Sequence, residues 1–202
     1  MAAVRLGVLG GTFDPPHYGH LLLAEQAREQ LRLERVLWVP AGDPWRKAGA
    51  VVSAGEHRAA MVSKAIEDNE AFEVDAREIE RAGPSYTVDT LASLKEELPE
   101  AELVFLLGTD ALADLPNWHD APRVIQLALL GAAARGGDRL DAVALDALLP
   151  LLSGRVVWFD MPRVDISASD LRERAAEGHS LRYFVPPAVE DYIVRHKLYS
   201  PA

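Results

Sequence analysis

The amino-acid sequence predicts an α/β fold, with a mostly parallel β-sheet covered by helices on both faces. Apolar runs of strand length alternate along the chain with segments whose apolar residues recur at helical spacing. Short polar clusters follow several of the predicted strands, which is where ligands collect in open parallel sheets. With 202 residues, 49% of them hydrophobic, the chain can bury a core, and it fits a single domain over residues 1–202 better than two.

The predicted elements alternate in the order that parallel strands require. We expect strands at residues 4–9, 35–39, 72–74, 103–107, 127–132 and 156–159, because each is a short, mainly apolar run. Apolar residues at helical spacing predict helices at 21–31, 57–66 and 88–98, with a further candidate rich in Ala and Leu at 140–152. The Gly- and Pro-rich stretches at 40–49 and 134–138 are expected to be loops. Since parallel strands need crossover helices, this order indicates a Rossmann-like sheet.

Composition excludes several classes of protein. A formal net charge of -10 and an isoelectric point near 5.0 argue against a general nucleic-acid-binding protein, which needs a basic face for phosphates. The chain has no cysteine, so disulfides, thiolate zinc sites and cysteine nucleophiles are excluded. The apolar run at the N-terminus is too short for a signal peptide, and no later stretch reaches the roughly 18 unbroken apolar residues of a membrane span. We therefore expect a cytoplasmic protein without a membrane partner; the sequence carries no signal for its oligomeric state.

The first polar cluster, GGTFDPPHYGH at residues 10–20, lies between the first predicted strand and the first predicted helix. Its two leading glycines allow the backbone to come close to a ligand, and Pro15 or Pro16 suits a first helical turn, where a missing N–H is harmless. His17 and His20 are spaced to share one side of a helical turn, at a helix N-terminus that would face an anion. The segment therefore predicts a phosphate site.

The same cluster is also compatible with roles that involve no phosphate. It could be a strand-to-helix turn with Asp14 as the helix cap, and the histidines could be ordinary surface residues. A pair of metal ligands is disfavoured, because the usual metalloprotease spacing is i, i+4 with an adjacent glutamate, and neither occurs here. The glycines of residues 7–11 do not form G-x-G-x-x-G, so a dehydrogenase loses its main support.

The residues of this cluster resemble the G-x-F-x-P-x-H-x-G-H motif of the HxGH nucleotidyltransferase superfamily. Further segments recur in the order of one family within it: Pro40, Pro44, Lys47 and Arg58 are similar to a P-x(3)-P-x-K pattern with a downstream Arg, followed by PSYTVDTL at 84–91, GTD at 108–110 and NWH at 117–119. Over essentially the whole chain, this set resembles the bacterial nicotinate-nucleotide adenylyltransferases. The resemblance implies transfer of AMP from ATP to nicotinate mononucleotide, giving deamido-NAD and pyrophosphate in NAD biosynthesis. It also implies Mg²⁺ that accompanies ATP and is held mainly by the phosphates.

The segment ISASDLR at 166–172 resembles the second signature of the family, I-S-S-T-x-I-R, and departs from it at Ala168, Ser169 and Leu171. Ser169 keeps a hydroxyl where threonine is expected, whereas Ala168 has no side-chain donor. Ser167 and Asp170 also form a capping-box pattern, which would begin a helix without any ligand. Because a capped N-terminus with Arg172 one turn further on is still an anion site, both interpretations can hold.

The resemblance implies roles for individual residues. His17, His20, Lys47 and Arg172 would be catalytic, and no protein residue is expected to bind a metal. ATP would be bound by Gly10, Gly11, Thr12, Phe13, His17, His20, Gly108, Asp110, Ser167, Ser169 and Arg172. The acceptor would be bound by Lys47, Thr87, Trp118 and His119, with Trp118 stacked on the pyridine ring and the backbone at Thr87 and His119 holding the carboxylate.

Several of these assignments have plainer alternatives. Lys47 could be a solvated loop lysine, with Arg46 as its competitor for a phosphate. Trp118 could fill a gap in the core, and Asp110 could cap a helix over 111–115. The remaining histidines, His57, His179 and His196, match no motif and are interpreted as surface or packing residues.

Rival functions differ in the acceptor or in catalysis itself. The acceptor could be nicotinamide mononucleotide or phosphopantetheine, although Thr87 and Trp118 argue against phosphopantetheine. A non-catalytic nucleotide-binding regulator would keep the fold and the ATP site. The presence of His17, His20 and Arg172 argues against such an inactive site.

Overall fold

A parallel sheet organises the part of the chain that the computed structural model describes, which is residues 4–43, 52–136, 139–140, 143–144, 147, 150, 152 and 154–200. Its strands are β1 (Arg5–Gly11), β2 (Arg35–Pro40), β3 (Phe72–Val74), β4 (Glu102–Gly108), β5 (Leu129–Arg135) and β6 (Val156–Met161). They lie in the order β3-β2-β1-β4-β5-β6, and every neighbouring pair is parallel. The predicted Rossmann-like sheet is therefore confirmed, with its strand order reversing between β1 and β4.

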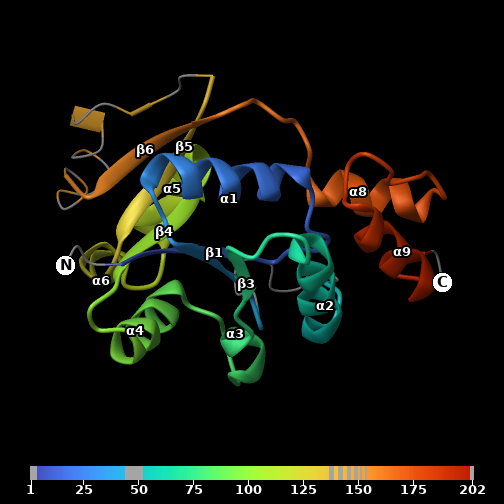
Figure 1. Cartoon of the computed structure of the whole chain (residues 1–202), viewed down its shortest axis with the longest axis horizontal. Helices are drawn as coiled ribbons and strands as arrows, with labels where there is room; N and C mark the ends of the chain where they lie inside the picture. Colours follow the sequence, from blue (N-terminus) through green and yellow to red (C-terminus); the bar gives the residue numbers. More distant parts are fainter. Residues whose placement is uncertain are drawn as a thin grey trace.

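Helices cover both faces of the sheet, as predicted (Figure 1). Residues alternate along each strand: Val36 and Trp38 of β2 face one core, and Leu37 and Val39 face the other. The first core contains residues of α1 (Tyr18–Leu31), α2 (Gly55–Ile66), α8 (Ala168–Ala176) and α9 (Pro187–Arg195). The second contains residues of α4 (Thr87–Glu97), α5 (Thr109–Asp114), the 3-10 helix η2 (Leu115–Asn117) and α6 (Ala121–Leu127). A short helix, α3 (Arg77–Glu80), follows β3.

The predicted strands and crossover helices are found at their expected places, with small differences at their ends. β1 continues through Gly10 and Gly11, two residues beyond its predicted end at residue 9. The expected strand at 127–132 begins too early, because Leu127 is the last residue of α6 and β5 starts at Leu129. A continuous apolar run joins this helix to this strand, so the boundary leaves no mark in the pattern. Most of the helix predicted at 140–152 lies outside the described residues.

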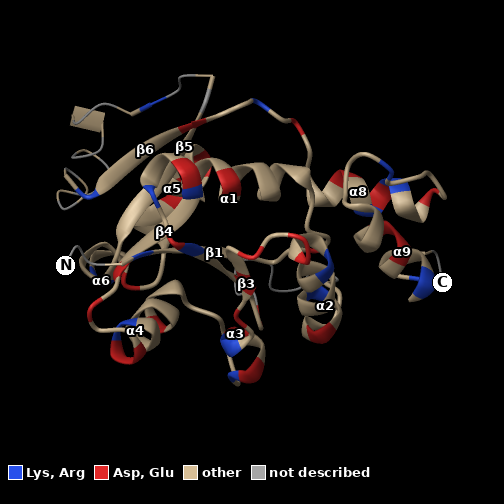
Figure 2. Ribbon diagram, in the orientation of Figure 1, with Lys and Arg blue, Asp and Glu red and all other residues tan. Residues whose placement is uncertain are grey.

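The C-terminal helices α8 and α9 lie together at one end of the molecule, beside α2 (Figure 1). Among the described residues, no helix is long and apolar enough to cross a membrane. In Figure 2, the ribbon segments of Lys and Arg, coloured blue, are interspersed with those of Asp and Glu, coloured red, on the outer helices.

Candidate active site

The site predicted from the sequence lies at the carboxyl ends of β1 and β4, where the strand order reverses. These strands are neighbours in register, with Val8 of β1 opposite Phe105 of β4, so Gly11 and Gly108 end the two strands at the same level. The chain then passes into α1 on one face and α5 on the other. In sheets of this kind the divergence of the two helices leaves a crevice for a ligand.

At the end of β1, an exposed glycine is followed three residues later by a buried phenylalanine. Gly10 is exposed, whereas the Phe13 side chain is only 2% exposed and lies against Trp38 with ring centroids 5.3 Å apart. A Cβ at Gly11 would come within 2.9 Å of the Phe13 ring, so packing requires the glycine at this position. Since the Phe13 ring is buried, a contact between Phe13 and ATP would have to come from its backbone.

His17 and His20 lie side by side at the start of α1. His17 is the N-cap residue, and its ring stacks on that of His20 with centroids 3.8 Å apart and planes inclined by 30°. The backbone N–H of His17 donates to Nδ1 of His20 at 3.3 Å, so the proton of a neutral His20 ring belongs on Nε2. Gly19 permits this arrangement, because a Cβ there would come within 3.0 Å of Nδ1 of His17. The histidines are brought together on one side of the helical turn, as the spacing predicted.

Two expectations for the same segment are wrong. Pro15 and Pro16 do not lie in the first turn of a helix, because the extended N-cap residue His17 separates them from α1. Asp14 does not cap α1 either. Its side chain is 1% exposed and is engaged elsewhere: Oδ1 accepts from the Tyr199 hydroxyl at 2.6 Å, and Oδ2 accepts from the Ser53 N–H at 3.1 Å.

The N-terminus of α8 lies against the first motif. Ser167 is the N-cap residue, and its hydroxyl accepts from the Asp170 N–H at 3.1 Å, which confirms the capping interpretation. One turn further on, the Arg172 guanidinium donates to the Asp14 carbonyl at 2.8 Å and to the Ser169 hydroxyl at 3.4 Å. The two sequence signatures, more than 140 residues apart, are thus joined by a hydrogen bond from Arg172.

Of the predicted acceptor residues, Thr87, Trp118 and His119 lie near one another on the α4 side of the sheet. Thr87 is the first residue of α4, and the preceding Tyr86 stacks on His119 with ring centroids 4.2 Å apart. Trp118 meets the Phe105 ring edge-on at 5.8 Å and donates from Nε1 to Asp114 at 3.2 Å. The half-buried Trp118 therefore packs on the second core, as its plainer alternative predicted.

The remaining predicted residues have different outcomes. Gly108 ends β4 and is the N-cap residue of α5, and Asp110 lies in the first turn of that helix, so the alternative that Asp110 caps it is wrong. Lys47 and its competitor Arg46 lie outside the described residues. His57 and His196 pack around Tyr192, and the exposed His179 pairs with Glu177, in line with their interpretation as packing and surface residues. In the described part of the chain, no group of at least three metal-ligating His, Asp or Glu side chains is present.

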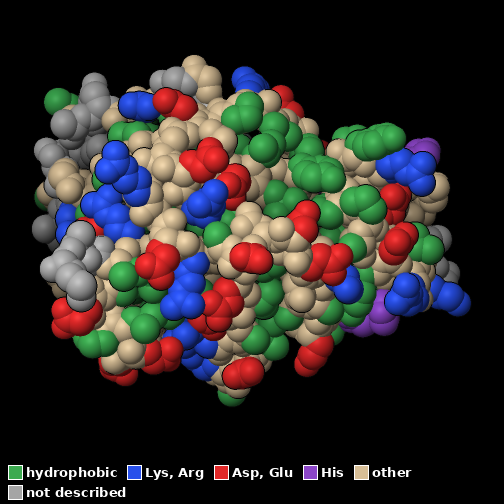
Figure 3. Space-filling view, in the orientation of Figure 1, with side chains coloured by type: hydrophobic (Ala, Val, Ile, Leu, Met, Phe, Trp, Pro, Cys, Tyr) green, Lys and Arg blue, Asp and Glu red, His purple; other side chains and the backbone are tan. Residues whose placement is uncertain are grey.

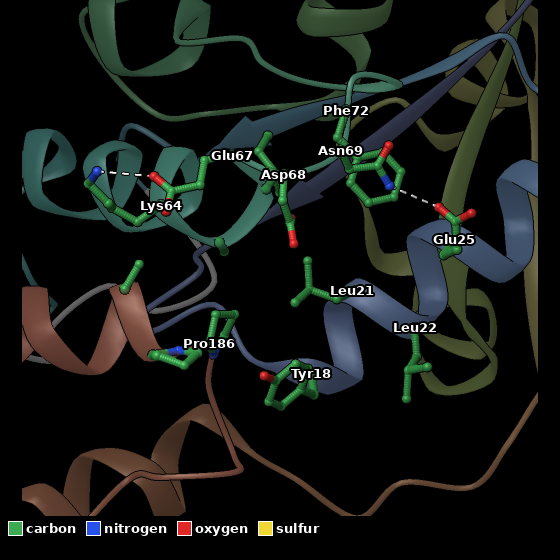
Figure 4. Close-up of a pocket in the computed structure, with 14 residues that line it drawn as sticks. Tyr18, Leu21, Leu22, Glu25, Lys64, Glu67, Asp68, Asn69, Phe72 and Pro186 are labelled. Carbon is green, nitrogen blue, oxygen red and sulfur yellow. Dashed lines mark hydrogen bonds and ion pairs between the residues drawn. The ribbon is translucent and has the colours of Figure 1, made fainter.

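A separate hollow of about 530 Å³ lies between α1, the end of α2 and the start of α9. Its apolar lining includes Leu21, and Figure 3 shows hydrophobic side chains gathered over α1 near α8. Carboxylates of Glu25, Glu67 and Asp68 also line it, and Asp68 points toward Leu21 across the hollow (Figure 4). None of the predicted site residues lines this hollow, and its acidic residues would repel a phosphate.

Comparison with known proteins also identifies relatives among the nucleotidyltransferases. A family model described as cytidylyltransferase-like matches residues 8–174. The chain belongs to this cytidylyltransferase-like family. It is 48% identical to a probable nicotinate-nucleotide adenylyltransferase of Thermomicrobium roseum, over 96% of this chain and 91% of the relative. It is also 48% identical to a protein of the same description from a Roseiflexus species, over 98% of this chain and 100% of the relative.

Solved structures show the same fold. A Plasmodium falciparum nicotinic acid mononucleotide adenylyltransferase complexed with NaAD superposes with a TM-score of 0.78 at 20% identity, covering 97% of each chain. The same enzyme complexed with APC gives a TM-score of 0.77 at 19% identity, again over 97% of each chain. At identities of 20% and 19%, the structural likeness is evidence for a shared fold alone.

Proposed function

We propose that this chain transfers AMP from ATP to the phosphate of nicotinate mononucleotide, producing deamido-NAD and pyrophosphate as a step of NAD biosynthesis. The observation that carries the proposal is the hydrogen bond from Arg172 to the Asp14 carbonyl, which joins the two signatures expected to bind ATP, near the carboxyl ends of β1 and β4. The curated relatives, whose names specify this reaction, support the choice of acceptor.

The geometry suits direct adenylyl transfer. An oxygen of the acceptor phosphate forms a bond to the α-phosphorus of ATP while the bond from that phosphorus to the pyrophosphate oxygen breaks, with the two oxygens roughly in line. Such a reaction needs positioning and neutralisation of charge and requires no covalent enzyme intermediate. The Nε2–H of His20 would donate to the transferring phosphate, and the N-terminus of α8 with Arg172 and Ser169 would hold the leaving pyrophosphate.

Mg²⁺ belongs to the proposal as a companion of ATP. The groups that the structure gathers at the motif are imidazoles, a guanidinium and backbone N–H groups, which suit phosphate oxygens, whereas Mg²⁺ prefers oxygen ligands. The ion would therefore be held mainly by the phosphates and would neutralise part of their charge. The cytoplasmic location predicted from the sequence stays a prediction.

Acceptor recognition would rest on the segment that contains Thr87, Trp118 and His119. The stacking of Tyr86 on His119 brings the start of α4 next to the loop after η2, so backbone N–H groups of both could bind one carboxylate. Hydrogen bonds to a charged group are stronger than those to a neutral amide, and nicotinamide would turn an NH₂ group toward at least one of these donors. The site would therefore favour nicotinate over nicotinamide mononucleotide.

The test is a comparison of the two acceptors under identical conditions with ATP and Mg²⁺, following dinucleotide and pyrophosphate together. We expect kcat/KM to favour nicotinate mononucleotide by at least about 10²-fold, because the amide would leave at least one of these backbone donors unpaired in the complex. Equal efficiency would contradict recognition of the carboxylate, and failure to form dinucleotide and pyrophosphate with either acceptor would support the non-catalytic regulator. A Trp118→Ala variant should lose affinity for both acceptors, since both present the same ring; unchanged affinity would leave Trp118 a packing role alone.

A further inference from the structure

Arg58 is a buried cation whose hydrogen bonds reach three separate segments of the backbone. The residue is 1% exposed. Its Nη1 donates to the Thr12 carbonyl at 3.0 Å, Nη2 donates to the Gly42 carbonyl at 3.0 Å, and Nε donates to the Ser53 carbonyl at 2.8 Å. Thr12 belongs to the first motif after β1, whereas Gly42 belongs to the loop after β2. A single side chain therefore ties the two loops at the carboxyl ends of neighbouring strands.

Packing alone does not account for a guanidinium in this position. Burial lowers the pKa of Arg58, while the nearby Asp14 carboxylate favours its charged form. Burying a charge is costly, and a well-packed apolar side chain often serves a core equally well. What an apolar side chain cannot supply is a planar group with donors in fixed directions, which holds several acceptors at set distances from one another.

Gly42 connects Arg58 to the start of α4. Its carbonyl accepts from Arg58, and its N–H donates to the Ser85 hydroxyl at 2.9 Å. The same hydroxyl accepts from the Asp43 N–H at 3.2 Å, and the Ser85 N–H donates to the Asp43 carbonyl at 2.9 Å. Ser85 itself is 9% exposed and directly precedes Tyr86, the N-cap residue of α4. Hydrogen bonds thus run without a break from Thr12 through Arg58 and Gly42 to Ser85.

We propose that Arg58 and Ser85 are positioning residues, which together set the distance between the ATP-binding motif at residues 10–20 and the acceptor segment at the start of α4. The inference rests on the proposed function. In-line transfer requires the acceptor oxygen to lie at the α-phosphorus, yet each substrate is held by its own loop, and neither loop alone fixes the separation. The hydrogen bonds through Gly42 fix the distance between the two substrate-binding segments. Their loss should slow the chemical step while leaving each substrate bound almost as before.

The test compares Arg58→Lys, Ser85→Ala and the double variant with the wild type. A lysine keeps the charge but cannot hold three divergent carbonyls, and Ser85→Ala removes the acceptor of two N–H groups. We expect each single change to lower kcat by at least about 10-fold, because small misplacements of reacting groups strongly reduce the rate of the chemical step. Calorimetric Kd values for ATP alone and nicotinate mononucleotide alone should change by less than about 3-fold, close to the range that substitutions outside a contact produce.

Arg77→Lys is the matched control. Arg77 also makes several hydrogen bonds, to Asp75, Ser93 and Glu97, but it joins α3 to the C-terminal half of α4, whereas the acceptor segment lies at the start of that helix. This variant should lower the thermal midpoint and leave kcat unchanged. If a loss of kcat in Arg58→Lys were merely a loss of stability, Arg77→Lys at a similar thermal midpoint would show it too, and the proposal would be overturned.

The double variant separates one connection from two independent effects. Because both residues act through Gly42, the double variant should have a kcat no lower than that of the worse single variant within about 3-fold. Multiplied losses, or wild-type kcat in a folded Ser85→Ala enzyme, would overturn the proposal even if Arg58→Lys failed to fold. Failure of the wild type to use nicotinate mononucleotide would instead refute the proposed function, and the same variants would then be compared with the acceptor that the wild type does use.

Discussion

Alanine in place of Gly19 should separate activity from stability, because this glycine touches a histidine of the motif. A Cβ at Gly19 would lie 3.0 Å from Nδ1 and 3.1 Å from Cε1 of His17. Ordinary contacts between such atoms are about 3.5–4.0 Å, so the His17 ring would have to move by a few tenths of an ångström. The ring has little room, since it is 6% exposed and stacks on His20 at 3.8 Å. The displacement would therefore reach His20 as well.

The expected magnitudes follow from this displacement. A misplacement of about 1 Å can cost about 10²-fold in rate, so the smaller shift in Gly19→Ala should lower kcat by roughly 10-fold. Alanine improves helix propensity by about 0.5–1 kcal/mol, while overpacking costs about 1–3 kcal/mol. The net change in the free energy of unfolding is then at most about 2.5 kcal/mol, or a fall of up to about 10 °C in thermal midpoint for a chain of this size. A folded, slow enzyme is the expected result.

Steady-state kinetics and thermal unfolding of Gly19→Ala should be measured beside Gly55→Ala. Gly55 begins α2, and its Cβ would also meet an atom at 3.0 Å, but that atom is the Cγ2 methyl of Ile79, while Nη2 of Arg58 lies at an ordinary contact distance of 3.6 Å. Gly55→Ala should therefore keep wild-type kcat. Wild-type kcat in Gly19→Ala would refute the importance of the His17 ring position, and equal losses in both variants would show a general effect of added bulk.

The remaining predictions concern the histidine, the cap and a buried carboxyl group. His20→Ala should lower kcat by at least about 10²-fold with an almost unchanged thermal midpoint, as for loss of a preorganised donor; near-normal turnover would end the assignment. Ser167→Ala should lower the free energy of unfolding by about 0.5–2 kcal/mol in denaturant titrations, whereas Arg172→Ala should weaken ATP binding in calorimetry; unchanged ATP affinity and turnover in Arg172→Ala would place the phosphate site elsewhere. Burial raises the pKa of Glu78 above 4.5, so its contribution to stability is greatest below that value and is lost as the pH rises. The stability of the wild type relative to Glu78→Gln should therefore fall as the pH rises above the ordinary pKa of a glutamate, and a difference independent of pH would contradict this assignment.

Local sequence patterns are sufficient to predict the sheet and the first motif. Strands buried on both faces appear in the sequence as unbroken apolar runs, as in β4. The histidine pair can be predicted because its geometry depends on the spacing of two residues in one helical turn. Likewise, the Ser167 cap needs only residues within a few positions of one another.

The buried polar contacts could not be predicted, because their partners are far apart in the sequence. Asp14 meets Tyr199 across 185 positions and Arg172 across 158. Arg58 fits a sequence pattern, but nothing local indicates that its donors reach carbonyls rather than a ligand. An ionisable residue inside an otherwise apolar turn, such as Asp14 between Phe13 and Pro15, is the signal that could have indicated burial.

The position of α8 shows why the second signature needs the rest of the chain to act. The helix α8 follows β6, an edge strand that β4 and β5 separate from β1. Arg172 of α8 nevertheless reaches the motif that follows β1. The segment after β6 must therefore return past α1 to the crevice, and α1 packs directly against β6 along this path (Figure 1). Once there, α8 is held by the Asp14 carbonyl, while the Asp14 carboxylate is held by Tyr199 near the end of the chain. Since Asp14 receives both contacts, the packing of the C-terminal segment and the placement of Arg172 are coupled. Removal of the Tyr199 hydroxyl should therefore displace Arg172 at the site more than it disturbs the sheet.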